Sequence, residues 1–195
     1  MLQFIAAEND RYSIPEQVQM AIEGGCQWVQ LHLPGMDDAQ VREVAQEIIP
    51  LCRENGTILT VENRPEAAKE LGIHGVHLTD KSLNARQVRE QLGPEAIVGV
   101  QVTTPQAVLM LKGADIDYAT VDPSLTLTQA ADLIATAAQG GNAMPVVIEG
   151  DFTAGNVADA LKAGASGVAV GAAIGSADDP VAATAALINA LNSLQ

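Results

Sequence analysis

Cationic and aromatic residues are scarce in this sequence, and their scarcity argues against one class of protein. Ten Lys and Arg stand against 24 Asp and Glu, which gives a formal net charge of −14. A protein that binds nucleic acid needs a cationic face that releases counterions from the phosphates. Aromatic residues make up only 3% of the chain, which leaves few rings to stack on bases. We therefore expect no nucleic acid partner.

Long apolar runs and cysteines are also few. No apolar run approaches the roughly 20 residues that span a bilayer. Residues 1–7 lack the basic start and the length of a signal peptide. We therefore expect a cytoplasmic protein with no membrane contact. Cys26 and Cys52 show no C-x-x-C or His spacing that would indicate metal or redox chemistry, so we interpret both as buried thiols.

Hydrophobic residues, by contrast, make up 48% of the chain, and they occur in short β-rich runs that alternate with amphipathic stretches. This alternation predicts βαβ units and a parallel sheet. Nothing resembling a linker divides the sequence, so we expect residues 1–195 to form one domain. The expected strands are Leu2–Ala7, Trp28–Leu33, Ile58–Val61, Gly75–Leu78, Ile97–Val102, Tyr118–Val121, Pro145–Glu149 and Gly167–Val170.

A helix is predicted after each of these strands. The expected helices are Ser13–Glu23, Asp37–Glu54, Pro65–Leu71, Asn84–Leu92, Pro105–Leu111, Thr126–Gln139, Thr153–Ala163 and Pro180–Leu194. Eight such units favour an α/β fold of the closed (β/α)8 TIM barrel type, with any site at the carboxyl ends of the strands. The alternative is a doubly wound open sheet, which often has a Gly-rich first turn, whereas residues 8–11 contain no glycine.

The last predicted helix is expected to close the barrel. Its apolar face against the first and last units is predicted to consist of Val181, Ala185, Ile188 and Leu191.

Five stretches carry a family resemblance that runs in register over most of the chain. They are AIEGGCQWVQLHL from Ala21, LGIHGVHLTD from Leu71, LGPEAIVGV from Leu92, IDYATVDPS from Ile116 and VADALKAGASGVAVGAAI from Val157. Together they resemble the thiamine phosphate synthase family, which includes the related thiazole tautomerases. The resemblance implies a (β/α)8 barrel, commonly homodimeric, that joins a thiazole phosphate to a pyrimidine diphosphate. That reaction releases pyrophosphate with the assistance of Mg2+.

Two family patterns are altered in this chain. The pattern Gln-x-Arg-x-Lys on the second strand reads Gln30, His32 and Pro34 at its three fixed positions, so both phosphate-binding cations are missing. The pattern Asn-Asp-Arg after the third strand, whose Asp holds Mg2+, reads Glu62, Asn63 and Arg64. The Gln and the final Arg are the residues that match.

Two further family features lie after the fourth and sixth strands. The second metal-binding Asp of the family aligns with Ser82, although Asp80 lies two residues earlier. The loop at residues 123–126 has no Lys to cover a pyrophosphate, and the catalytic His of the tautomerases aligns with Pro123.

The resemblance nevertheless implies a set of substrate-binding residues at the strand ends. They are Gln30, Asn63, Arg64, Gln101, Gly150, Gly171 and Ala172. Gly150 and Gly171 would offer backbone N–H groups to a phosphate, or they merely permit tight turns. Asp151, which replaces a family glycine, would repel a phosphate unless it points to solvent.

Three residues are predicted to be catalytic. His32 replaces a substrate-binding Arg at the carboxyl end of a strand, where a general acid or base could act, and Glu62 directly follows the next strand. His77 either faces the mouth as an acid or base or is a hydrogen-bonded core residue.

Carboxylates are predicted to gather on the rim of the barrel, because Glu8, Glu62, Asp80, Asp122, Glu149 and Asp151 all fall at or just beyond strand ends. Glu62, Asp80 and Glu149 are the candidate ligands of a divalent ion, Mg2+ by the family resemblance. A His ligand would shift the choice towards Mn2+ or Zn2+. The alternative is that these acids point outward and are solvated separately.

Two functions therefore remain open on the sequence. The first is a synthase-like transferase that acts on a small phosphorylated substrate. The second is a diverged barrel that binds a phosphorylated metabolite or a partner without this chemistry.

Overall fold

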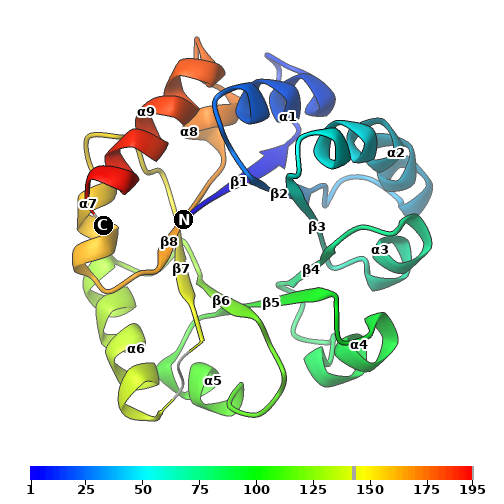
Figure 1. Cartoon of the computed structure of the whole chain (residues 1–195). Coiled ribbons are helices and arrows are strands. Elements are labelled where there is room, and N and C mark those ends of the chain that lie inside the picture. The colour runs from blue at the N-terminus through cyan, green and yellow to red at the C-terminus, as the bar shows by residue number, and fades with distance from the viewer. Residues whose placement is uncertain (142–143, 195) are drawn as a thin grey trace.

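Eight parallel strands pair in sequence order, and the first pairs with the last, so that the sheet closes into a barrel (Figure 1). This computed structural model describes residues 1–141 and 144–194. The predicted TIM barrel is confirmed, and the open-sheet alternative is wrong because it would leave two unpaired edges. The strands are β1 (Leu2–Ala7), β2 (Trp28–His32), β3 (Ile58–Glu62), β4 (Gly75–Leu78), β5 (Ile97–Val102), β6 (Tyr118–Val121), β7 (Val146–Glu149) and β8 (Gly167–Val170).

Helices surround the barrel, and all of those given below except α7 and α8 begin at a side-chain cap or a proline that the sequence supplies. Ser13 caps the first helix and forms a reciprocal capping box with Glu16. The helices are α1 (Ile14–Glu23), α2 (Asp38–Glu54), α3 (Pro65–Leu71), α4 (Ala85–Leu92), α5 (Pro105–Met110), α6 (Leu127–Gln139), α7 (Val157–Lys162), α8 (Ala172–Gly175) and α9 (Pro180–Ser193). The four-residue α8 was not expected, because it is too short to show a helical period. Helix α7 begins later than predicted, since residues 153–156 form a turn instead.

Helix α9 closes the ring of helices by packing on α1, α7 and α8, as expected. Its predicted face is right in part, because Leu191 is buried and Ile188 packs against the core, but Thr184 and Leu187 are buried in place of Val181 and Ala185. Thr184 can approach α1 because Gly24 has no side chain, and a Cβ there would lie 2.5 Å from the Thr184 Cβ. The close approach at Gly24 fixes the rotation of the helix.

The interior of the barrel holds an apolar cluster, which we call the apolar floor and to which Trp28 and Tyr118, the first residues of β2 and β6, belong. Ile5, Trp28, Tyr118, Val147 and Ala169 form this cluster, which is separate from the larger core between strands and helices. The Trp28 and Tyr118 rings meet edge to face with centroids 4.6 Å apart. Gly99 makes room for this contact, because a Cβ there would overlap the Tyr118 ring.

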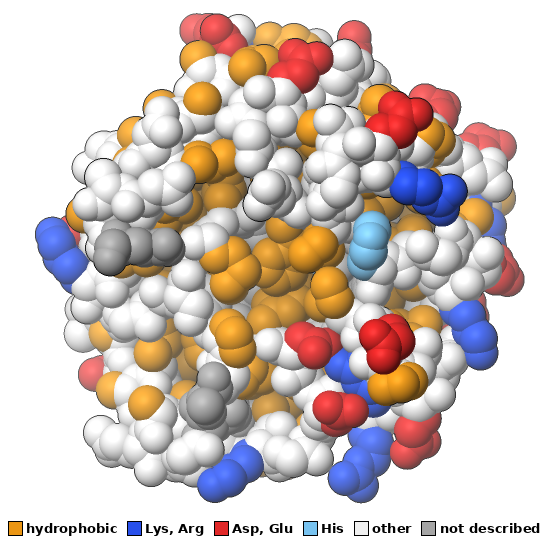
Figure 2. Space-filling model, in the orientation of Figure 1, with side chains coloured by type: hydrophobic (Ala, Val, Ile, Leu, Met, Phe, Trp, Pro, Cys, Tyr) orange, Lys and Arg blue, Asp and Glu red, His pale blue; other side chains and the backbone are white. Residues whose placement is uncertain are grey.

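Figure 2 shows the amino-terminal face, where hydrophobic side chains gather around a central hollow. The hollow is a pocket of about 510 Å³, and Met1, Trp28, Ile58 and Ile188 are among its lining residues. At the opposite end of the barrel, His32, Glu62 and Glu149 stand at the carboxyl ends of β2, β3 and β7.

Cys26 and Cys52 are buried free thiols, as predicted. Burial raises the pKa of Cys52 to about 12. Among the described residues, no helix is long and apolar enough to cross a bilayer.

Candidate active site at the barrel mouth

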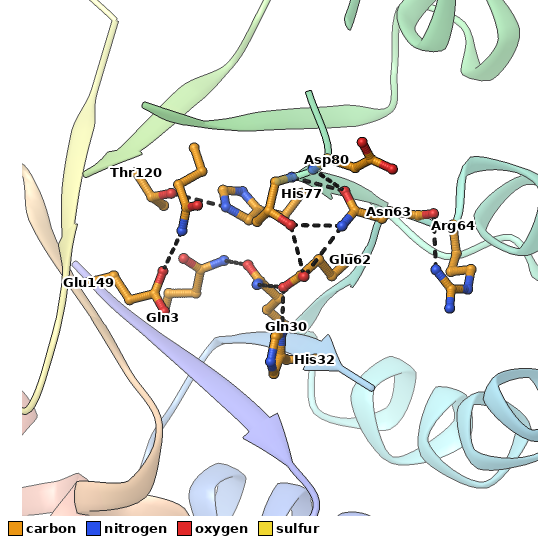
Figure 3. A network of polar contacts seen from close by, with 12 residues as sticks. Gln3, Gln30, His32, Glu62, Asn63, Arg64, His77, Asp80, Thr120 and Glu149 are labelled. Atoms are coloured by element: carbon orange, nitrogen blue, oxygen red, sulfur yellow. Dashed lines mark hydrogen bonds and ion pairs between the residues drawn. The ribbon is translucent and has the colours of Figure 1, made fainter. Parts of the chain in front are cut away.

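On β2 and β3, the inward-facing side chains become polar toward the carboxyl ends of the strands. On β2, Trp28 belongs to the apolar floor, and Gln30 and His32 follow at every second position. The same alternation on β3 brings Thr60 and Glu62 to the inside. We call the carboxyl-terminal opening of the barrel, where His32, Glu62 and Glu149 lie, the barrel mouth (Figure 3).

His32 and Glu62 form the shortest ion pair of the mouth. The Nδ1 atom of His32 lies 2.6 Å from Oε2 of Glu62, and the two side chains are 40% and 12% exposed. The hydrogen bond to Glu62 raises the pKa of His32 above its ordinary value. The carboxylate engages Nδ1, so Nε2 is the ring nitrogen that a bound molecule would meet.

Glu62 is held by several further donors. Thr79 donates its hydroxyl to Oε1 at 2.9 Å, and the amides of Gln30 and Asn63 lie at 3.4 Å from the carboxylate. Burial acts to raise the pKa of Glu62, but the hydrogen bonds and charge of His32 and the bond from Thr79 outweigh it, so the pKa is lowered. Glu62 is therefore an ionised group that orients His32.

Asn63 connects the ends of β3 and β4. Its backbone is left-handed, with a φ of 53°, a conformation that Asn tolerates better than most residues. Its carbonyl oxygen accepts the backbone N–H groups of Thr79 and Asp80, and its amide donates to the Thr79 hydroxyl at 2.7 Å. The side chain predicted to bind substrate is thus used to position Thr79 and, through it, Glu62.

Gln30 continues the network toward the barrel floor. Its carbonyl accepts a hydrogen bond from Gln3 at 2.8 Å, and Gln3 also donates to the Tyr118 hydroxyl at 3.3 Å. Gln30 is only 2% exposed. Gln30 therefore contacts Glu62 from the interior of the barrel, and its amide already donates to the Glu62 carboxylate.

His77 does not reach the mouth. It is fully buried, its Nε2 lies 3.0 Å from the Thr120 hydroxyl, and its ring stacks on Tyr118. Burial lowers the pKa of His77 to about 4, which keeps it neutral. This geometry supports a core role for His77 and gives no support to the predicted catalytic role.

Glu149 enters the mouth from β7, on the far side from β3 (Figure 3). Gln101 on β5 donates to its Oε2 at 3.3 Å. Burial, with the nearby charges of Glu62 and Asp122, raises the pKa of Glu149, although Gln101 and His32 oppose the change. The mouth thus holds two carboxylates in different environments.

Arg64 is turned toward the protein. Its Nε lies 2.9 Å from the Asp38 carboxylate, and its terminal nitrogens lie 3.4 Å from the carbonyls of Met36 and Asn63. A substrate phosphate would have to displace Asp38, which is the first residue of α2.

The loops after β7 and β8 contain the predicted glycine sites. Gly150 donates its N–H to the Ala169 carbonyl and packs against Phe152, so it serves the local turn. Gly171 precedes α8, and Ala172 is exposed at the start of that helix. Asp151 is exposed to solvent, as one alternative required.

The predicted rim of acids does not assemble into a metal site. Asp80 and Asp122 accept the backbone N–H groups of Ser82 and Ser124, while Glu8 is exposed. Within residues 1–141 and 144–194, no group of three or more His, Cys, Asp or Glu side chains could hold a metal ion. The proposed set of Glu62, Asp80 and Glu149 therefore does not fit Mg2+.

A pocket of about 470 Å³ opens beside the mouth, between the loop that follows β4 and helix α5. Thr79 and Gln101, the partners of the two mouth carboxylates, line it. Lys81 and Arg86 also line this pocket. The sequence interpretation missed both cations, since neither lies in a family pattern.

Comparisons with known proteins agree on one family. A family model described as thiamine monophosphate synthase matches residues 2–174. A thiamine-phosphate synthase of Bacteroides fragilis is 32% identical over 200 residues, which cover 96% of this chain and 98% of that protein. A thiamine-phosphate synthase of Natronomonas pharaonis is 37% identical over 193 residues, covering 93% and 89%. The solved thiamine phosphate pyrophosphorylase of Pyrococcus furiosus superposes with a TM-score of 0.88 at 22% identity, covering 99% of this chain and 96% of that one, which shows the fold.

Proposed function

The chain belongs to the thiamine monophosphate synthase family, and from this premise we propose that it is an enzyme that binds a small phosphorylated heterocycle and moves a proton on it. The reaction takes place at the barrel mouth. His32 is the proton-transfer group, and Glu62 is the residue that positions it.

The observation that carries this proposal is the contact between His32 Nδ1 and Glu62 at 2.6 Å. A carboxylate on one ring nitrogen fixes the orientation of the imidazole and leaves Nε2 to exchange a proton with a bound molecule. His32 is partly exposed, so a substrate can reach it. Thr79 and Asn63 hold the carboxylate in turn, which supports a preorganised pair.

The pocket beside the mouth suits the substrate. Its volume of about 470 Å³ is in the range of small-molecule sites. Lys81 and Arg86 would attract a phosphate, while Thr79 and Gln101 place the other end of the molecule next to the mouth. Gly171 and Ala172, which the family resemblance suggests for the phosphate, are the alternative anchor, whereas the N–H of Gly150 already donates to Ala169.

Mg2+ has no role in the proposed proton transfer. Asn63 stands where the family has its metal-binding Asp, and the Asn63 side chain is occupied by Thr79 and Asp80.

A second candidate function is the joining of a thiazole phosphate to a pyrimidine diphosphate. The identity of 32% with the Bacteroides fragilis thiamine-phosphate synthase, over nearly the whole of both chains, favours it. Two features disfavour it, because the leaving pyrophosphate would need positive charge. His32 and Pro34 replace two cations of the family, and the side chain of Arg64 is engaged by Asp38.

One experiment separates these functions. The full chain is incubated in D2O with thiazole phosphate, and deuterium incorporation at carbon is followed by NMR. A parallel sample with the pyrimidine diphosphate and Mg2+ is assayed for thiamine phosphate. If the His32→Gln variant loses the exchange but keeps the circular dichroism spectrum of the wild type, the result supports proton transfer by His32. Thiamine phosphate formation without exchange would favour the second candidate. A thermal shift with thiazole phosphate but neither reaction would indicate a binding protein and overturn both.

The family resemblance and the sequence support two more proposals, namely a homodimer and a cytoplasmic location. Sedimentation equilibrium at micromolar protein tests the first, since a monomer mass would contradict it. Fractionation of the source cells tests the second.

A further inference from the structure

A chain of hydrogen bonds reaches the barrel mouth from Gln3, which lies on β1 inside the barrel. Gln3 is fully buried and stands 27 positions before Gln30 in the sequence. Its amide nitrogen donates to the side-chain carbonyl of Gln30 at 2.8 Å and to the Tyr118 hydroxyl at 3.3 Å. Toward these two neighbours, Gln3 therefore acts only as a donor.

The orientation of Gln3 is passed on to the ion pair at the mouth. Because Gln30 accepts from Gln3 through its carbonyl oxygen, its amide nitrogen is turned to the other side, where it donates to Oε2 of Glu62 at 3.4 Å. The same oxygen lies 2.6 Å from Nδ1 of His32. Gln3, Gln30, Glu62 and His32 thus form a continuous series, which we call the amide chain (Figure 3).

The two oxygens of Glu62 have different partners. Thr79 and Asn63 approach Oε1, at 2.9 and 3.4 Å. Oε2 is shared between His32 and Gln30 in the part of the chain that the structure describes. Gln30 is therefore the donor that competes with His32 for one carboxylate oxygen, and Gln3 decides whether Gln30 presents its nitrogen or its oxygen there.

Gln3 keeps this orientation although it leaves one of its own atoms without a partner. Its carbonyl oxygen, Oε1, is buried and has no hydrogen bond among residues 1–141 and 144–194. An unpartnered buried polar atom destabilises a fold. Turning the amide over would set Oε1 against the carbonyl oxygen of Gln30, which is also an acceptor. A local arrangement that opposes stability is expected where a side chain has a functional role.

We infer that Gln3 is a positioning residue, which turns the Gln30 amide toward Glu62 and so holds Oε2 of Glu62 in place against His32. The effect on turnover rests on the proposed function, in which His32 transfers a proton. The effect on the His32 and Glu62 pair needs no substrate, so it can be measured separately.

The variant Gln3→Met tests this inference, because Met fills a similar volume and cannot donate. Gln30 is then free to turn, and the Glu62 carboxylate, with one donor fewer, should hold the His32 proton more tightly. We therefore expect the pKa of His32, followed by NMR, to rise. The other charges that act on the pair come from Glu149 on β7 and His77 on β4, which the variant retains.

Stability separates this role from a structural one. Gln3→Met removes one unpartnered buried oxygen, that of Gln3, and leaves another, that of Gln30, so the Tm should stay close to the wild-type value. The matched control is Gln17→Met on α1. Gln17 is equally buried, but it donates to two backbone carbonyls outside the amide chain, so its variant should lower the Tm and leave the His32 titration unchanged.

Two further measurements bear on the amide chain. In the deuterium assay with thiazole phosphate, Gln3→Met should lower kcat by about tenfold or more with little change in KM, because a remote change that misplaces a reacting group can cost up to about 100-fold. In the wild-type chain, the side-chain amide hydrogens of Gln30 and Gln3 should shift in NMR spectra as His32 titrates. This second measurement decides the inference even if Gln3→Met does not fold.

The outcomes distinguish the inference from the proposed function. A His32 titration that Gln3→Met leaves unchanged, or that Gln17→Met alters as much, would overturn the inference. Amide hydrogens of Gln3 that do not respond to the His32 titration would overturn it as well. No exchange by the wild-type chain would overturn the proposed function, while the two titrations would still decide the role of Gln3.

Discussion

The variant Glu62→Gln tests whether the carboxylate at the barrel mouth controls His32. Gln has the same shape as Glu and can still accept the hydrogen bond from Thr79, but it carries no charge. Its amide group would face Nδ1 of His32, which then has to accept a hydrogen bond and lose its proton there. We therefore expect the pKa of His32 to fall in this variant.

The energetic size of the effect follows from the exposure of the pair. A hydrogen bond to a charged group contributes about 1.5–3 kcal/mol when it is protected from water. Because the His32 side chain is 40% exposed, solvent screening reduces the contribution to about 1 kcal/mol. For a domain of this size that loss lowers the Tm by about 2–4 °C.

The directions of the two pKa shifts decide how the stability of the fold depends on pH. The pKa of His32 is raised in the folded chain, so its contribution is present below the ordinary value of 6.5 and is lost as the pH rises through the folded value. The pKa of Glu62 is lowered, so its contribution is present above 4.5 and is lost as the pH falls through the folded value. The stability difference between wild type and Glu62→Gln should therefore be largest near pH 5.5 and smaller near pH 9.

Urea denaturation at these two pH values measures that difference, and NMR titration of the imidazole protons reports the His32 pKa. The chain has only three histidines, so assignment is simple. The control is Glu70→Gln, because Glu70 pairs with Arg42 at the surface and is 59% exposed. An unchanged His32 titration in Glu62→Gln, or equal destabilisation at both pH values, would refute the argument.

Three further outcomes are expected. Gly99→Ala should destabilise the fold by about 1–3 kcal/mol in urea titrations, because a methyl group there overlaps the Tyr118 ring, whereas Gly155→Ala should be neutral. A chain that ends at Asp179 should lose its cooperative melt by calorimetry, because the buried residues of α9 cover the first and last units, and a melt near the full-length value would contradict the one-domain prediction. Calorimetric titration of chelator-treated protein with Mg2+ and Mn2+ should show binding no tighter than roughly millimolar, and tighter binding would restore the metal site.

The architecture could be predicted because its signals are local and repeated. Each strand end lies within one residue of its prediction, since a buried parallel strand is a short β-branched run bounded by turn residues. The face of α9 could not be predicted, because the contact between Gly24 and Thr184 joins residues 160 positions apart. Periodicity alone gives an apolar stripe, and it does not give the rotation that tertiary contacts select.

The site, like the fold, could be predicted where its signals are local and could not be predicted where they depend on tertiary contacts. His32, Glu62 and Glu149 could be expected at the mouth, because strand parity and the carboxyl ends of strands place them there. The hydrogen-bond partners of the two carboxylates, Glu62 and Glu149, could not be predicted. Thr79 lies two residues after the inward-facing His77, and this parity was the one signal that could have identified it. Asp80 and Asp122 turned out to accept backbone N–H groups of their own loops, which is a local preference of Asp that competes with metal binding.

The charge of the mouth also constrains how a phosphorylated substrate can lie. With His32 protonated and with Glu62 and Glu149 ionised, these three side chains carry a net charge of −1. Two unit charges about 4 Å apart repel by about 4 kcal/mol at an effective dielectric constant near 20, so a phosphate placed at the mouth would be disfavoured. Lys81 and Arg86 line the adjacent pocket and offer the opposite charge. A molecule with its phosphate in that pocket and a neutral ring at the mouth avoids the repulsion, and it also brings the ring to His32, which would exchange its protons.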